Sequence, residues 1–205
     1  MSCNVWSVQR ERVHMTGNLQ DRLNKIIPRL TSDELLHNQG LGNEIGFYIF
    51  DYPPEHELAV RDYLQVVLKH IGKKKPGIRV KHINLFALII DYLKEAKFLD
   101  KAIILQGKKG NLALAKALKG PLESKKIAKF FTAKADPKNH DLILISGVGS
   151  AWPILRSHNL LNNLHPLMGS TPLVMFYPGV YTGAGMKLFG RMKEDNYYRA
   201  FQLVP

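Results

Sequence analysis

Apolar residues along the chain form two kinds of pattern, short continuous runs and longer stretches with helical spacing. Three runs, 45–50, 142–146 and 173–177, are almost wholly apolar, which is typical of strands covered on both faces. The runs at 78–83 and 198–204 have the length and composition of strands as well. Five strands are therefore expected.

Stretches with helical spacing of apolar residues separate these runs. They predict helices over 17–36, 55–71 and 84–97, and Asn84 stands where it can cap the third of them. Alternation of strands and helices indicates an α/β fold with three layers and a mainly parallel sheet of five strands. The expected core resembles that of P-loop or Rossmann-like proteins.

The link between the second and third strands is too long for a single crossover helix. It contains three helical patterns, at about 98–106, 111–118 and 121–133. The predicted breaks between them are Gly107, Gly110 and Gly120-Pro121.

The length of 205 residues and the hydrophobic fraction of 45% suit one well-buried domain. We expect that domain over residues 17–205, with a helical, lysine-rich insertion at about 98–135. Residues 1–16 fit no element and Met15 opens the first orderly segment, so we expect either a flexible tail or an overcalled start.

Composition limits the compartment and the chemistry. Cys3 is the only cysteine, which excludes disulfides and Cys-rich zinc sites. No apolar run approaches the roughly 20 residues of a membrane span. Polar and charged residues, Gln9, Arg10, Glu11 and Arg12, occupy the place of a signal-peptide core. We therefore expect a soluble, cytoplasmic protein with no membrane contact.

Basic residues exceed acidic ones, with a net charge of +12 and a pI near 9.8. Nine lysines and one acid, Glu123, lie within 101–134. Lysine suits phosphate backbones but is poor at distinguishing bases, so this segment is a candidate DNA-binding surface. Solvated helix faces are the plainer interpretation. The candidate DNA or phosphate contacts are Lys108, Lys109, Lys125, Lys126 and Lys129.

Ligands of open α/β sheets bind at the carboxyl ends of the strands, so phosphate-binding motifs are expected in the loops that follow them. The strand order suits the core of a P-loop ATPase, with 45–50 preceding the phosphate loop. That loop, however, contains Asp51, Pro53 and Pro54, and prolines remove backbone donors while acids repel a triphosphate. No Gly-x-x-x-x-Gly-Lys-Ser/Thr motif occurs.

The loop after the third strand carries a Gly-x-Gly pair, Gly147 and Gly149, that resembles the start of a dinucleotide site. Trp152 occupies the place of the third glycine, and no acid follows the next strand. We therefore interpret this loop as structural, with Ser150 capping the following helix and Pro153 in its first turn. We expect Trp152 to be buried and to close the crevice.

The predicted helix after this loop has a polar side of low charge. Arg156, Asn159 and Asn163 recur at spacings that place them in one stripe. A neighbouring stripe consists of His158, Asn162 and His165. Metal ligation by His158 and Asn162 lacks a carboxylate or thiolate to support it. The side chains bond either a partner protein or the chain's own loops.

Catalytic motifs do not assemble elsewhere. The sequence has no Gly-x-Ser-x-Gly elbow and no His-Glu-x-x-His motif. We expect no catalytic residues, no metal and no cofactor.

Several long stretches closely resemble the BrxB family, a domain found in BREX bacteriophage-defence systems. The resemblance runs from about residue 17 to the C-terminus. The stretches are Gly40-Leu-Gly-Asn-Glu-Ile, Phe50-Asp-Tyr-Pro-Pro-Glu-His-Glu-Leu58, Ser146-Gly-Val-Gly-Ser-Ala-Trp-Pro-Ile-Leu-Arg-Ser-His-Asn-Leu-Leu-Asn-Asn-Leu-His-Pro166, Pro172-Leu-Val-Met-Phe-Tyr-Pro-Gly179, Leu188-Phe-Gly-Arg and Asn196-Tyr-Tyr-Arg-Ala-Phe201.

The resemblance implies a small component of a prokaryotic antiviral system that acts beside an AAA ATPase, a methyltransferase and the phosphatase-like protein PglZ. It brings no catalytic residues with it. Our first hypothesis is a non-enzymatic adaptor that binds PglZ through the polar helix and the C-terminal segment. The alternatives are a DNA-binding module and a nucleotide-responsive protein. The candidate partner interface comprises Arg156, His158, Asn159, Asn162, Asn163 and Arg191.

Overall fold

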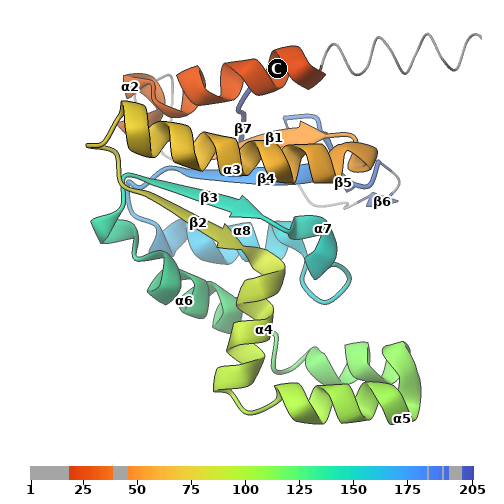
Figure 1. The fold of residues 1–205 in the computed structure, drawn as a ribbon. Coiled ribbons are helices and arrows are strands. Elements are labelled where there is room, and N and C mark those ends of the chain that lie inside the picture. Colours follow the sequence, from red (N-terminus) through yellow and green to blue (C-terminus); the bar gives the residue numbers. More distant parts are fainter. Residues whose placement is uncertain (1–18, 39–45, 184, 191, 194–199) are drawn as a thin grey trace, which may run out of the picture.

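A computed structural model of the chain describes residues 19–38, 46–183, 185–190, 192–193 and 200–205 (Figure 1). The predicted tail at 1–16, the alternative start at Met15 and the candidate interface residue Arg191 lie outside these described residues.

Five strands form a parallel sheet in the order β2-β3-β4-β1-β7. A short antiparallel extension follows, in which β5 pairs with β4 and β6 pairs with β5. The mainly parallel α/β fold predicted from the sequence is therefore confirmed. The strands are β1 (Phe47–Tyr52), β2 (Val80–Asn84), β3 (Leu142–Ser146), β4 (Leu173–Tyr181), β5 (Met186–Leu188), β6 (Met192–Lys193) and β7 (Phe201–Gln202).

β3 matches its predicted extent of 142–146, whereas β1 and β2 are offset by one or two residues from the predicted 45–50 and 78–83. Two further strands differ more. β4 continues through Pro178 to Tyr181, beyond the predicted end at 177, although proline lacks an N–H donor. The Pro178 carbonyl still accepts a hydrogen bond from the Phe189 N–H at 2.9 Å, so the pairing with β5 carries the strand past the proline. β7 is only two residues long, whereas the prediction covered 198–204.

Helices cover both faces of the sheet (Figure 1). A helix over residues 19–30, α2 (Asp33–Leu36) and α3 (Glu57–Lys74) lie on one face. The other face is covered by α4 (Leu85–Glu95), α6 (Ser124–Ala135), α7 (Val148–Ala151) and α8 (Ser157–Leu164). Short 3-10 turns occupy Pro54–His56, Pro137–Asn139 and His165–Leu167.

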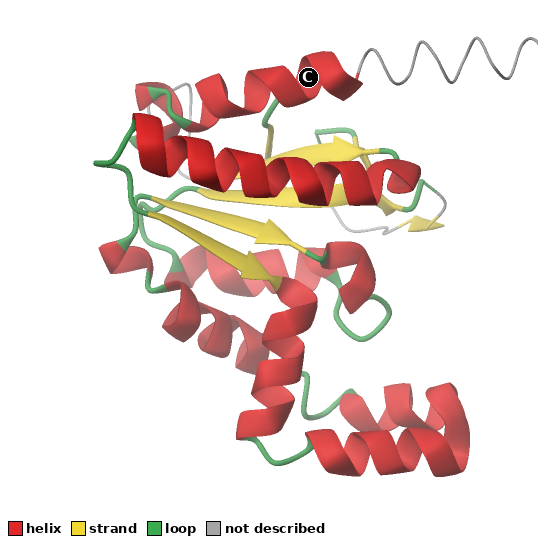
Figure 2. Cartoon of the chain, viewed as in Figure 1, coloured by secondary structure: helices red, strands yellow, loops and turns green. Residues whose placement is uncertain are grey.

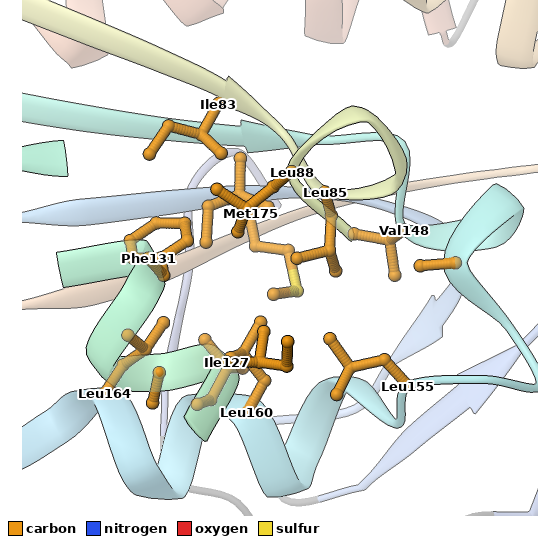
Figure 3. Packing of buried hydrophobic residues seen from close by; sticks show 14 of the residues in the cluster. Ile83, Leu85, Leu88, Ile127, Phe131, Val148, Leu155, Leu160, Leu164 and Met175 are labelled. Atoms are coloured by element: carbon orange, nitrogen blue, oxygen red, sulfur yellow. The ribbon is translucent and has the colours of Figure 1, made fainter. Parts of the chain in front are cut away.

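Alternate strand residues divide the core between the two faces. In β1, Tyr48 and Phe50 point to the face covered by α3, whereas Phe47 and Ile49 point to the face covered by α4, α6 and α8. Figure 3 shows the second cluster, in which Phe131 of α6 and Leu160 of α8 pack below Met175 of β4. Burial on both faces explains why the strand sequences are continuous in apolar residues.

Helix α5 (Leu99–Leu118) is interrupted at Gly110, whose φ of 76° and ψ of −180° reverse the chain. The predicted break at Gly110 is confirmed, but Gly107 lies inside the first arm and breaks nothing. Figure 2 shows the two arms as a helical hairpin that projects away from the sheet. α6, by contrast, packs into the layer beside α8, with Ile127 and Ala128 fully buried.

The segment after Gly147 differs from the expected single helix. Ser150 lies within the four-residue α7 rather than capping a long helix, and Pro153 lies in the loop that precedes α8. Arg156 occupies the N-cap position of α8. A loop of five residues therefore replaces the helical turns predicted from Ser150 onward.

Candidate functional site

Asp51 lies near the carboxyl end of β1, at the place where a ligand of this fold would bind, and only 8% of its surface is exposed. One carboxylate oxygen, Oδ1, accepts a hydrogen bond from the Arg22 guanidinium at 2.8 Å. The other, Oδ2, accepts from the backbone N–H of Tyr181 at 3.0 Å. Gln202 donates to Oδ1 from 3.4 Å. The carboxylate is therefore occupied by the chain's own donors.

Arg22 joins more than one segment at this point. Its guanidinium also donates to the backbone carbonyls of Asp51 at 2.8 Å and Val204 at 2.9 Å. It lies 4.9 Å from the centre of the Phe50 ring. The helix over 19–30, β1 and the C-terminal residues are thus fixed to each other by one side chain.

The loop after β1 is similarly fixed. Pro53 precedes the 3-10 turn and Pro54 begins it, so neither supplies an N–H group to a ligand. The Tyr52 hydroxyl donates to the Glu57 carboxylate. Burial, aided by this hydrogen bond, raises the pKa of Tyr52 above its ordinary value. The tyrosine stays neutral at physiological pH.

The Gly147 loop is shaped by its neighbours. Gly147 has a φ of 71°, and a Cβ at this position would lie 2.5 Å from Oδ1 of Asn84. That oxygen caps α4 by accepting from the Ala87 N–H at 3.1 Å, as the sequence predicted for Asn84. A Cβ on Gly149 would lie 3.1 Å from both Phe189 and Pro178. A side chain at either glycine would therefore collide with Asn84, Phe189 or Pro178.

Trp152 is half-buried rather than fully buried. Its indole meets the Phe189 ring edge-on, with 6.2 Å between the ring centres and an interplanar angle of 86°. It packs at the margin of the core on the side of the sheet covered by α4 and α8. The sequence alone does not identify Phe189 as its partner, because 37 positions of chain separate the two residues.

The structure brings together one pair that the sequence did not indicate, His82 of β2 and Ser146 of β3. The imidazole Nε2 lies 2.8 Å from the serine Oγ. Burial lowers the pKa of His82, so the ring is neutral near pH 7. Among the described residues no carboxylate orients this histidine, as a nucleophile–base pair requires. The pair is best explained as a hydrogen bond that holds the two strand ends together.

The polar residues of helix α8 are exposed and buried in a different pattern from the predicted one. His158 is only 2% exposed, so it belongs to the buried side of the helix and not to an exposed stripe. Arg156, Asn159 and Asn162 are exposed, and Asn163 is half-buried. The Asn163 amide donates to the Asn159 carbonyl at 2.7 Å. An amide-rich surface headed by Arg156 remains, and we call these four residues the α8 surface.

The candidate lysines form two groups rather than one. Lys108 and Lys109 lie beside the turn of the α5 hairpin, whereas Lys125, Lys126 and Lys129 lie on α6, on the other side of α4 (Figure 1). All five are exposed. Lys126 also reaches the Gly120 carbonyl at 3.1 Å.

A pocket of about 890 Å³ lies at the opposite end of the parallel strands, where β2, β3 and β4 begin. Arg79 and Asp141 form an ion pair of 2.8 Å on its wall, and hydrogen bonds from Arg79 lower the pKa of Asp141 to about 2. Two further cations, Lys129 and Lys138, line the pocket. This pocket was not predicted from the sequence, because the loops expected to bind ligands lie at the carboxyl ends of the strands.

Two kinds of site are absent from the described residues. No group of three or more His, Cys, Asp or Glu side chains is arranged to hold a metal ion within the described part of the chain. No helix in that part has the length and apolar character needed to cross a bilayer.

Fold and site together define a mainly parallel α/β protein in which the carboxylate near the end of β1 is bonded by the chain's own donors. The chain belongs to the BrxB family, since the family model described as BREX protein BrxB matches residues 81–203. It is 43% identical over 187 residues to the BREX protein BrxB of Escherichia coli O9:H4 (strain HS), covering 91% of this chain and 92% of that protein. The BREX protein BrxB of Bacillus cereus (strain H3081.97) is 40% identical over 190 residues, covering 91% and 97%. No solved structure matches the chain significantly.

The Arg22–Asp51 pair should contribute strongly to stability. Replacing Asp51 by Asn removes the charge opposite a partly buried guanidinium, and we expect a loss of about 3 kcal/mol in the free energy of unfolding, measured with urea. Asp141→Asn is the matched control, because its partner Arg79 is more than half exposed and the loss should be much smaller. Equal losses in the two variants would contradict this ranking.

The two glycines Gly147 and Gly72 should respond in opposite directions to alanine. Gly147→Ala forces a side chain into left-handed backbone against Asn84 and should destabilise the protein by about 2 kcal/mol or more. Gly72 lies in α3 with open space around it, so Gly72→Ala should stabilise by roughly 0.5–1 kcal/mol. A neutral Gly147→Ala in thermal and urea unfolding would show that the loop has room to relax.

Proposed function

We propose that the protein is a non-catalytic adaptor of a BREX anti-phage complex and that it binds the PglZ phosphatase-like protein. The observation that carries the proposal is that Asp51 is bonded to donors of the chain itself. Its carboxylate lies near the carboxyl end of a strand, where ligands of this fold bind, and is bonded to Arg22 and to the Tyr181 N–H. We infer that such a scaffold acts through its surface. Membership of the BrxB family supports a role for that surface among BREX proteins.

The α8 surface is the candidate contact for the partner. Arginine is frequent among interface hot spots, and its planar guanidinium can pair with a carboxylate through two hydrogen bonds. Within the described residues, the Arg156 guanidinium makes no hydrogen bond or ion pair that would hold it to the chain itself. Exposed Asn159 and Asn162 supply donors and acceptors without the desolvation cost of further charges.

A second candidate function of this protein is DNA binding. It is favoured by the exposed lysines of α5 and α6, of which Lys108, Lys109, Lys125 and Lys129 form no ion pair among the described residues. Exposed apolar side chains on α5 fit a phosphate backbone poorly. The group on α6 is therefore the better site for this second function.

The adaptor proposal is tested with the double variant Arg156→Glu/Asn163→Ala. It should keep the wild-type melting temperature, because both side chains lie outside the core, but lose copurification with tagged PglZ and protection against phage.

The matched control is Lys73→Glu/Gln65→Ala on α3, which makes a similar change in charge and size on the opposite face of the sheet. It should retain both properties. A folded α8 variant that still binds PglZ would overturn the proposed contact. An unfolded one would place these side chains in the structural framework.

The DNA hypothesis makes a separate prediction about salt. If α6 binds phosphates, the slope of log affinity against log salt should become shallower by about 0.9 for each phosphate that Lys125→Glu/Lys126→Glu/Lys129→Glu no longer neutralises. Lys108→Glu/Lys109→Glu on the hairpin serves as the control with the same kind of charge change. Identical slopes for wild type and the α6 variant, in a fluorescence anisotropy titration with duplex DNA, would exclude α6 as the site.

A further inference from the structure

The α5 hairpin is defined by specific contacts at its turn and at its base. Gly110 reverses the direction, and the Gln106 amide donates to Oδ1 of Asn111 across the turn at 2.9 Å. At its base, Ala102 and Leu118 are buried in the core cluster shared with α4 and α6. The hairpin is therefore anchored at one end and projects into solvent at the other (Figure 2).

The projecting arms carry large apolar side chains that the fold does not cover. Leu112 is 89% exposed, Ile103 58% and Ile104 56%. Phe98, just before the first arm, is also exposed. Single exposed apolar residues are common on soluble proteins, but several within one projecting element mark an interaction surface.

The hairpin is predominantly basic. Five lysines lie within 98–119 and Asp100 is the only acid. None of these lysines forms an ion pair among the described residues, whereas nearby Lys94 and Lys134 pair with carboxylates. The lysines are Lys101, Lys108, Lys109, Lys116 and Lys119.

Apolar and basic positions are mixed along the first arm. Lys101, Ile104 and Lys108 follow one another at spacings of three and four, so they share one stripe of the helix. The turn itself, from Gln106 to Asn111, is polar, and Leu112 follows directly after it. Apolar contact is therefore available along both arms, up to the edge of the turn.

We propose that the α5 hairpin docks an amphipathic helix of a partner protein, with acidic residues flanking its apolar stripe. A surface that mixes exposed apolar side chains with lysines is complementary to such a helix in both hydrophobicity and charge. A polar, lysine-bearing tip is unsuited to insertion into a bilayer, and exposed Ile and Leu side chains gain nothing from a DNA backbone. Two copies of the hairpin would repel each other. This surface is distinct from the α8 surface and goes beyond the PglZ contact proposed above.

The test is photo-crosslinking in cells that contain the complete defence system. p-Benzoylphenylalanine replaces Leu112, and the matched control carries it at Leu58 of α3, which is 69% exposed on another element. We expect a crosslink from position 112 and none from position 58. Mass spectrometry should map it to a segment of another BREX protein with carboxylates at helical spacing. The proposal would be overturned by the absence of a crosslink from position 112, or by a crosslink to a second copy of the chain or to a segment without acids.

Charge reversal provides an independent test of the proposal. Lys101→Glu/Lys108→Glu should reduce the yield of the crosslink by about tenfold, and replacing the mapped acids by lysines should restore it. Unchanged yield would overturn the proposal, as would binding of the wild-type protein to phosphatidylglycerol vesicles or duplex DNA that Leu112→Ser abolishes. The α8 variant Arg156→Glu/Asn163→Ala should leave the crosslink intact, so failure of the PglZ contact and failure of this one are distinguishable.

Discussion

The ion pair between Arg22 and Asp51 is the interaction on which the arrangement of this molecule depends. Its 2.8 Å contact lies at the carboxyl end of a central strand, between β4 and β7, and the same guanidinium reaches the Val204 carbonyl. A charged pair of this kind is costly to bury and is stabilising only when its remaining hydrogen bonds are made. Tyr181 and Gln202 donate to the carboxylate, whereas the buried Arg22 Nε has no hydrogen-bond partner among the described residues. Both carboxylate oxygens of Asp51 are therefore bonded within the chain.

The strands and most helices could be predicted because their signals are local. A strand buried on both faces is apolar throughout, and β3 was predicted to the residue for that reason. The ends of β4 and β7 depended on pairing with β5 and β1, which no local pattern specifies. The Arg22–Asp51 pair spans 29 positions and the Arg22–Val204 contact 182, so neither leaves a trace in the nearby sequence.

The candidate site, too, could be predicted only in part. Glycine at 147 and 149 was recognisable, but the side chains that require it, Asn84 and Phe189, come from distant segments. His158 was assigned to an exposed stripe because helical geometry fixes spacing and not orientation. α8 is eight residues long and packs against both the sheet and α6, so more than one side is buried and His158 lies inside.

An adaptor must hold its contact surfaces in a fixed relation while each remains free to bind. α8 achieves this by burying Leu160, Leu161 and Leu164 beneath the sheet, which orients Arg156 and the asparagines outward. The α5 hairpin achieves it by a different route, since only its base is packed and its lysines and exposed apolar residues project from it. Because the core residues that fix one surface are not the residues exposed on the other, a substitution on either surface can be made without altering its counterpart. The two surfaces are therefore separable by mutation, as the proposed role of joining two partners requires.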